Sequence, residues 1–334
     1  MMSLSPHSPA KTGPRTRKLR DRALIAGLLG LVAVGLVGLA SATGWEETRA
    51  QLARLHLWQI AALLGLSALN YLLRGARWHL LARRLGLRTR LTQDLRHYLG
   101  GFAMSVTPGR VGELVRMRWL KRETGWPMER TAPLALMDRA GDLAAMGLIL
   151  ALSISLAAGG IAGALPVTLF ALGAAIVATR PRLLAALITA AHRATGRMPR
   201  LFARARRAAR SMARFSHAPT LAGVIALGLA GWLAEGISFH LLLVWLGADI
   251  GLWKAVAIFV FATLAGGLTG APGGLGGAEA AMVALLSLDG VPLEVSIPAT
   301  AVIRLTTLWF AIAIGLAVFP LAERRAAAAG GGRA

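Results

Sequence analysis

The chain has 334 residues, of which 56% are hydrophobic, and its mean hydropathy is +0.60. This composition is too apolar for a soluble globular domain, and the lack of cysteine excludes disulfides, thiolate chemistry and thiol-ligated zinc. The formal net charge is +22, but the basic residues fall between long apolar runs. That pattern indicates membrane topology and contact with anionic lipid headgroups, and it argues against nucleic-acid binding.

Six apolar segments are predicted to span the membrane, because each approaches or exceeds the ~20 residues that a bilayer core requires. The predicted spans are 23–42, 57–78, 131–157, 165–179, 219–246 and 296–320, with a disordered basic tail at 1–22, an arginine-rich loop at 180–218 and a basic tail at 321–334. The first segment ends in Ala-Ser-Ala, so a cleaved signal peptide is the competing interpretation there. Its long apolar core favours a retained helix.

Two further stretches, 94–122 and 253–289, are apolar but interrupted. The interrupting residues are Pro108, Gly109 and Gly112 in the first stretch and Pro272, Gly273, Gly274 and Gly276 in the second. Broken backbone at membrane depth is tolerated only where it packs against protein or lines a cavity. We therefore predict two re-entrant hairpins whose tips meet inside the bundle.

The distribution of lysine and arginine supports this topology. With the N-terminus in the cytoplasm, the cytoplasmic segments hold 32 of these residues and the outer segments only three. The asymmetry is the positive-inside pattern. It persists only if each hairpin enters and leaves on one side, the first from the cytoplasm and the second from outside, with both termini cytoplasmic.

The spacing of the special residues predicts an internal repeat of three spans with a hairpin before the third, 23–160 and 161–320. Pro108 corresponds to Pro272 at an offset of 164, and Glu113 to Glu279 and Asp138 to Arg304 at offsets of 166. Because three is an odd number of spans, the second unit is inverted relative to the first. Inverted repeats with broken helices near the midplane are typical of transporters.

Charged residues at membrane depth are the candidate site, because such groups are costly in hydrocarbon and are usually paired or functional. The acids are Glu113, Asp138, Asp142, Glu235 and Glu279, and the bases are Arg110, Arg116, Arg139 and Arg304. Two interpretations stay open: internal ion pairs that lock hairpins to spans, or ligands for an anionic headgroup.

Four of these residues illustrate the choice. Arg110 either pairs with Glu113 or presents its planar donors to a phosphate at a helix N-terminus. Arg304 requires an anionic partner, either Glu279 or a substrate. Glu235 is either protonated and structural or a proton-coupling site, and Arg139 can pair with Asp142.

The motifs TPGRVGELVR, MDRAGDL, PGGLGGAE and VIRLTT, in this order, resemble the lysylphosphatidylglycerol synthase transmembrane-region family, also called flippase-like integral membrane proteins. The resemblance covers about 23–320. It implies a protein of the bacterial or archaeal inner membrane that moves a lipid between leaflets, with Arg110, Glu113, Asp138, Arg139, Glu279 and Arg304 at the polar centre. The chain ends soon after the last predicted span, so the soluble aminoacyl-transferase domain of two-part synthases, and hence lysyl transfer, is not expected.

We therefore expect an all-α polytopic membrane protein that translocates a lipid or lipid-linked envelope precursor, without cofactor or metal. TPGRVGE lacks the lysine and Ser/Thr of a nucleotide loop, and no catalytic triad or metal-ligand cluster is evident. The alternatives are a membrane-embedded lipid transferase and an accessory subunit that recruits lipid-biosynthesis enzymes. The expected partners are membrane lipids with anionic headgroups. For a stand-alone member, the resemblance also implies varied lipids such as hopanoid-type and polyprenyl-linked lipids.

Overall fold

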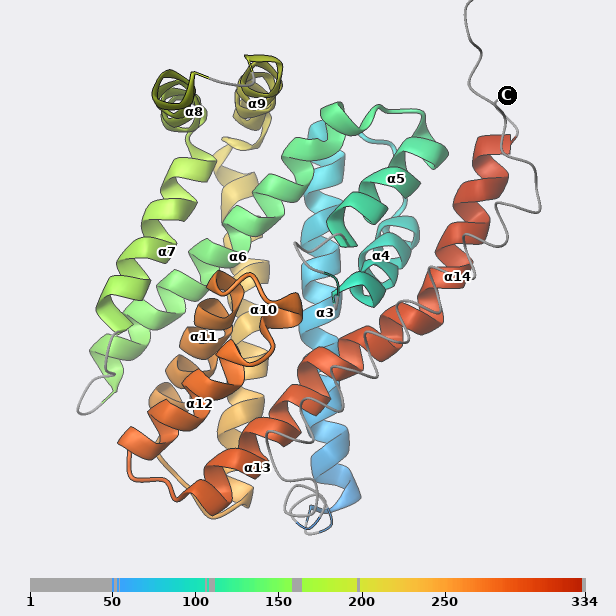
Figure 1. Ribbon diagram of the computed structural model, residues 1–334. Coiled ribbons are helices and arrows are strands. Elements are labelled where there is room, and N and C mark those ends of the chain that lie inside the picture. The colour runs from blue at the N-terminus through green and yellow to red at the C-terminus, as the bar shows by residue number, and fades with distance from the viewer. Residues whose placement is uncertain are drawn as a thin grey trace, which may run out of the picture.

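The computed structural model describes residues 50, 53, 55–105, 107, 112–157, 164–196 and 199–331. Within these ranges every regular element is helical and no β-strand occurs, which confirms the all-α class (Figure 1). The predicted tail 1–22, the predicted span 23–42 and the tip residues Pro108, Gly109 and Arg110 lie outside the described residues.

Among the described residues, four helices are long and apolar enough to cross a bilayer. They are α3 (Leu57–Leu85), α6 (Met128–Leu156), α10 (Ala218–Trp245) and the continuous stretch Leu293–Gly330. The last consists of α13 (Leu293–Arg304), a π-helical turn at Leu305–Trp309 and α14 (Phe310–Gly331). α3 extends beyond its predicted end because Gly86, at a φ of 100°, forms the C-cap and Arg83 and Arg84 complement the helix dipole.

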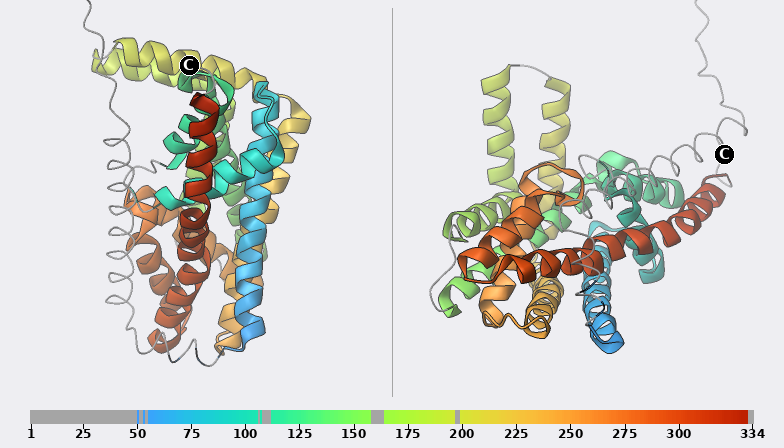
Figure 2. Two further views of the ribbon diagram at one scale, coloured as in Figure 1. Left: turned by 90° about the vertical axis from the view of Figure 1, so that its right-hand side faces the viewer. Right: turned by 60° about the horizontal axis from the view of Figure 1, so that its bottom comes forward.

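The segment 180–218, which we expected to be a loop, is largely helical. α7 (Ala164–Thr179) is followed at once by α8 (Pro181–Thr195), and the two axes are bent by 99°. α8 and α9 (Pro199–Ser211) lie across the end of the bundle (Figure 2). The proline at the start of α8 has no N–H to lose and favours a new helix in a new direction. The bent pair α7 and α8 would be a fifth candidate span.

Two pairs of short helices occupy the interrupted stretches. α4 (Leu91–Gly100), a 3₁₀ turn (Gly101–Met104) and α5 (Gly112–Thr124) form the first. α11 (Leu252–Leu268), a 3₁₀ turn (Pro272–Gly274) and α12 (Gly277–Leu288) form the second. The two pairs approach each other from opposite ends of the bundle (Figure 1). Their turns meet inside it, where Gly273 lies against the backbone carbonyl of Ser105.

Glycine is required at two places in this meeting region. Gly273, Gly274 and Gly276 have φ values of 62°, 70° and 80°, a left-handed conformation that other residues adopt only with strain. Gly315 of α14 packs directly on the backbone of Phe102 and Ala103, where no side chain fits. The glycines of the second turn thus supply positive φ, and Gly315 supplies close backbone approach.

A buried ion pair links α3 to α6. The Arg77 guanidinium on α3 is fully buried, and its Nε and Nη2 donate to Oδ1 of Asp138 on α6 at 2.9 and 2.7 Å. Our charge count placed Arg74 and Arg77 in a cytoplasmic segment, which is wrong, because α3 continues and carries both into the interior. Without them the segments predicted to be cytoplasmic still hold 30 basic residues, so the asymmetry persists.

Replacement of Arg77 by alanine is expected to destabilise the protein by about 3–5 kcal/mol, because it leaves buried carboxylates uncompensated. The matched control is Arg84→Ala, which removes an exposed arginine of the same helix and should cost less than about 0.5 kcal/mol. Denaturant unfolding of the purified protein in detergent micelles measures both. Equal stability of the two variants would contradict the structural role of Arg77.

Candidate functional site

A cavity of about 360 Å³ lies where the two short-helix pairs meet. Its charged lining residues are Arg74, Arg116, Arg139, Asp142, Glu235 and Arg304, and its apolar lining includes Phe102, Met146, Phe170, Phe259, Leu264 and Leu308. Among the described lining residues, four arginines and two carboxylates leave an excess of two positive charges when all six are ionised. A positive, partly apolar chamber inside an apolar bundle is suited to an anionic group carried on a hydrophobic molecule.

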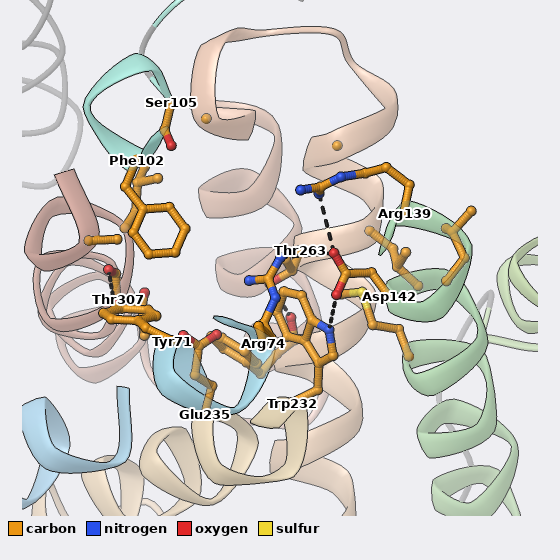
Figure 3. Close-up of a pocket in the computed structure, with 18 of the residues that line it drawn as sticks. Tyr71, Arg74, Phe102, Ser105, Arg139, Asp142, Trp232, Glu235, Thr263 and Thr307 are labelled. Carbon is orange, nitrogen blue, oxygen red and sulfur yellow. Dashed lines mark hydrogen bonds and ion pairs between the residues drawn. The ribbon is translucent and has the colours of Figure 1, made fainter. Parts of the chain in front are cut away.

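Asp142 on α6 is the common acceptor on one wall of this cavity. Its Oδ2 accepts from Nη2 of Arg74 at 2.8 Å, and its Oδ1 accepts from Nη2 of Arg77 at 2.8 Å and from Nε1 of Trp232 at 3.1 Å. Arg139 lies 3.3 Å from the same carboxylate, which confirms the predicted Arg139–Asp142 pair. Figure 3 shows Arg139 and Trp232 joined to Asp142 from two sides. The carboxylate is therefore saturated and fixed.

Arg74 is the site residue that the sequence analysis missed. It comes from α3, and its guanidinium carbon lies 4.8 Å from the ring centroid of Trp232, a cation–π distance. Its Nε has no hydrogen-bond partner among the described residues. The signal was present, because Arg74 and Arg77 lie three residues apart on one helix face inside the predicted span 57–78. The charge count nevertheless assigned both residues to the cytoplasmic segment.

Asp138 lies behind the cavity wall rather than on it. Its carboxylate binds Arg77, and Nη2 of Arg139 is 3.8 Å from its second oxygen. Arg139, by contrast, keeps 28% of its side chain exposed and directs its guanidinium into the cavity (Figure 3). The structure therefore separates two neighbours that the sequence analysis treated alike, because Arg139 lines the cavity and Asp138 lies behind its wall.

Arg304 braces the turn between α11 and α12. Its Nε donates to Oε1 of Glu279 at 2.5 Å, and its Nη2 donates to the carbonyl of Gly273 at 2.8 Å. Of the two partners we considered, Glu279 is the one observed. Arg304 also lines the cavity, so the residue that holds the turn is part of the cavity wall.

The π-helical turn after Arg304 lies at the same level. A π turn disturbs the regular hydrogen-bond ladder, and such turns are frequent at functional sites. The carbonyl of Thr307 in this turn accepts from the Tyr71 hydroxyl of α3. Tyr71 and Glu235 lie on the side of the cavity opposite Arg139 (Figure 3).

The remaining predicted residues belong to the first turn region. Arg116 lines the cavity, and its guanidinium carbon lies 4.0 Å from the ring centroid of Tyr98. Gly112 and Glu113 begin α5, and the side chain of Glu113 is outside the described part. Within the described ranges, no group of three or more His, Asp or Glu residues is placed to hold a metal ion.

Comparison with known proteins adds the family. A match to the family described as lysylphosphatidylglycerol synthase TM region covers residues 24–315. Two proteins of Methanothermobacter thermautotrophicus, each named UPF0104 membrane protein, are 38% identical over 89 residues and 30% identical over 101 residues. These alignments cover 27% and 30% of this chain and only 26% and 30% of the relatives. The extent of the family match and the apolar helices together show that the chain is a multi-pass membrane protein of the lysylphosphatidylglycerol synthase transmembrane-region family.

Proposed function

We propose that this protein moves a lipid with an anionic headgroup between the leaflets of a bacterial cytoplasmic membrane. The observation that carries the proposal is the cavity, which is lined by four arginines at the meeting point of two helix pairs from opposite ends of the bundle. Arginine in a low-dielectric chamber is expensive unless an anion or a functional need compensates it. A phosphate-bearing headgroup supplies that anion.

The cavity offers separate places for the headgroup and the tail. Arg74 and Arg139 both line the chamber, and a planar guanidinium suits phosphate oxygens. Phe170 of α7 and Leu268 of α11 line the same cavity but are 55% and 61% exposed. A lipid could therefore keep its tail at this apolar edge, in the bilayer, while only the headgroup enters.

The same proposal includes six spans, two re-entrant hairpins and two inverted repeats. In support, α3, α4–α5 and α6 have the same element order as α10, α11–α12 and α13–α14. Glu113 and Glu279 each lie in the first turn of the second hairpin helix, and Asp138 and Arg304 each lie within the span that follows. Access would alternate as one half moves against the other around the arginine-lined cavity.

The orientation follows from charge. We propose that the end carrying α8 and α9 faces the cytoplasm, because the segment 180–218 has ten arginines and no acidic residue. The chain would act as a carrier rather than an enzyme. A lipid-modifying transferase, or an accessory subunit that recruits lipid-biosynthesis enzymes, is the alternative.

Substitution of the cavity arginines is expected to slow lipid transfer. In proteoliposomes with fluorescent phosphatidylglycerol, Arg139→Gln and Arg74→Gln should each reduce the protein-dependent transfer rate by on the order of tenfold or more, because a charge-assisted hydrogen bond is lost. A membrane-impermeant quencher measures the labelled lipid in each leaflet. Arg88→Gln, an exposed arginine outside the cavity, is the control and should transfer like wild type. Equal lipid transfer rates in wild-type and protein-free vesicles would refute the proposed function.

The orientation is testable because the chain contains no cysteine. In intact cells, a single Thr189→Cys in α8 should be protected from an impermeant maleimide added outside, whereas Glu294→Cys at the start of α13 should react. Permeabilised cells should label both positions, which controls for reactivity. The reverse pattern would invert the proposed topology.

A deletion strain distinguishes carrier from enzyme. Mass spectrometry of total lipids should show an unchanged inventory, while surface labelling should show one anionic lipid depleted from the outer leaflet. Loss of a lipid species from the total extract would favour the transferase instead.

A further inference from the structure

Glu235 is an acidic lining residue that the headgroup contacts described above do not use. It lies near the middle of α10, is 5% exposed, and lines the cavity. Figure 3 shows it beside Tyr71 and Arg74, across the chamber from Arg139. A carboxyl group at this depth is held there against a large desolvation cost, which requires an explanation.

Its electrostatic surroundings differ from those of the other buried acids. Asp138, Asp142 and Glu279 each have an arginine nitrogen within 3 Å. Among the described residues, no arginine, lysine or histidine nitrogen comes within 4 Å of the Glu235 carboxylate. An acid without a close cation in a low-dielectric cavity can be neutral or charged depending on what else occupies that cavity.

The groups that face Glu235 come from three elements packed against α10. Asn70, Tyr71 and Arg74 belong to α3, Asp142 to α6 and Arg304 to α13. α11 contributes no charged group to the cavity lining, only Thr263 among its polar residues. The acid is therefore within the field of two arginines that are already committed to Asp142 and Glu279.

We propose that Glu235 is the proton-binding site of a coupled carrier, in which one proton and one anionic lipid occupy the cavity together; this rests on the proposed lipid transport. Charged Glu235 repels an incoming headgroup phosphate and competes for Arg74. A proton from the aqueous phase that binds the carboxylate removes both effects, and its departure on the other side expels the headgroup. By linkage, headgroup binding raises proton affinity at Glu235 by the same factor.

The stoichiometry makes the transport step electroneutral for a lipid of charge −1. The proton and the lipid move in the same direction, so the lipid accumulates in the leaflet that faces the higher pH. Full coupling of one proton gives a leaflet ratio that shifts by about tenfold for each pH unit across the membrane. An electrical potential alone should not shift the ratio.

The test uses the full chain in proteoliposomes with fluorescent phosphatidylglycerol and an imposed pH difference. In wild-type vesicles the leaflet ratio of the lipid should shift by about tenfold for each pH unit imposed, measured above the passive background of protein-free vesicles. Glu235→Gln, fixed in the neutral form, should equilibrate the lipid with no shift. Glu235→Asp should restore pH dependence, and Glu294→Gln, an exposed acid at one end of the bundle, should behave as wild type.

A second measurement does not need transport by a variant. Wild-type protein in weakly buffered detergent should take up about one proton for each short-chain phosphatidylglycerol bound, detected by a pH-indicator dye. Any of three results would overturn the role of Glu235 and leave lipid transport intact. These are wild-type transport that does not depend on the pH difference, a Glu235→Gln variant with the same pH dependence as wild type, and lipid binding without proton uptake. A wild type that moves no lipid would overturn the proposed function itself.

Discussion

The fold depends on the pairing of guanidinium groups inside an apolar bundle. A buried arginine cannot be neutralised by losing its proton at any physiological pH, so its helix must lie where carboxylates can reach it. Arg74 and Arg77 of α3 and Arg139 of α6 all converge on Asp142, and Trp232 of α10 completes the set. This one carboxylate therefore fixes three long helices relative to one another.

The cavity is a consequence of that fixation. The side of the network toward Arg77 and Asp138 is fully packed, whereas the side toward Arg74 and Arg139 borders the turns of the two short-helix pairs. A turn with free backbone groups cannot face lipid, so it must lie in the interior. Arg304 serves the second turn in the same manner, because it satisfies a carbonyl of Gly273 while bound to Glu279. The buried guanidinium of Arg304 and the free carbonyl of the turn thus satisfy each other's hydrogen bonding in the interior.

Sequence reasoning predicted what periodicity and chain chemistry determine locally. The helical class, four of the spans, the apolar break at Pro272 and the Arg139–Asp142 pair were all readable, and Glu279 was one of two partners left open for Arg304. Arg74 was not recognised, because the charge count assigned it to a cytoplasmic segment although the predicted span 57–78 contains it. The 99° bend into α8 was missed for a related reason: an arginine-rich composition indicates a polar environment but not whether the backbone is helical. Which acid lacks a nearby cation also depends on helix packing and cannot be read from spacing.

The position of the π turn links these features to motion. Its five residues, Leu305–Trp309, directly follow Arg304, so the last long helix is irregular at the depth of the cavity. The hydroxyl of Tyr71 supplies a hydrogen bond to Thr307 from a neighbouring helix, which lowers the cost of the irregularity. A helix bends most readily where its own ladder is already interrupted. α14, which packs against α4, α5 and the first turn, can therefore change angle relative to α13 and the second turn with the least loss of hydrogen bonding. The cavity is lined by Arg304 directly before this turn and by Thr307 and Leu308 within it.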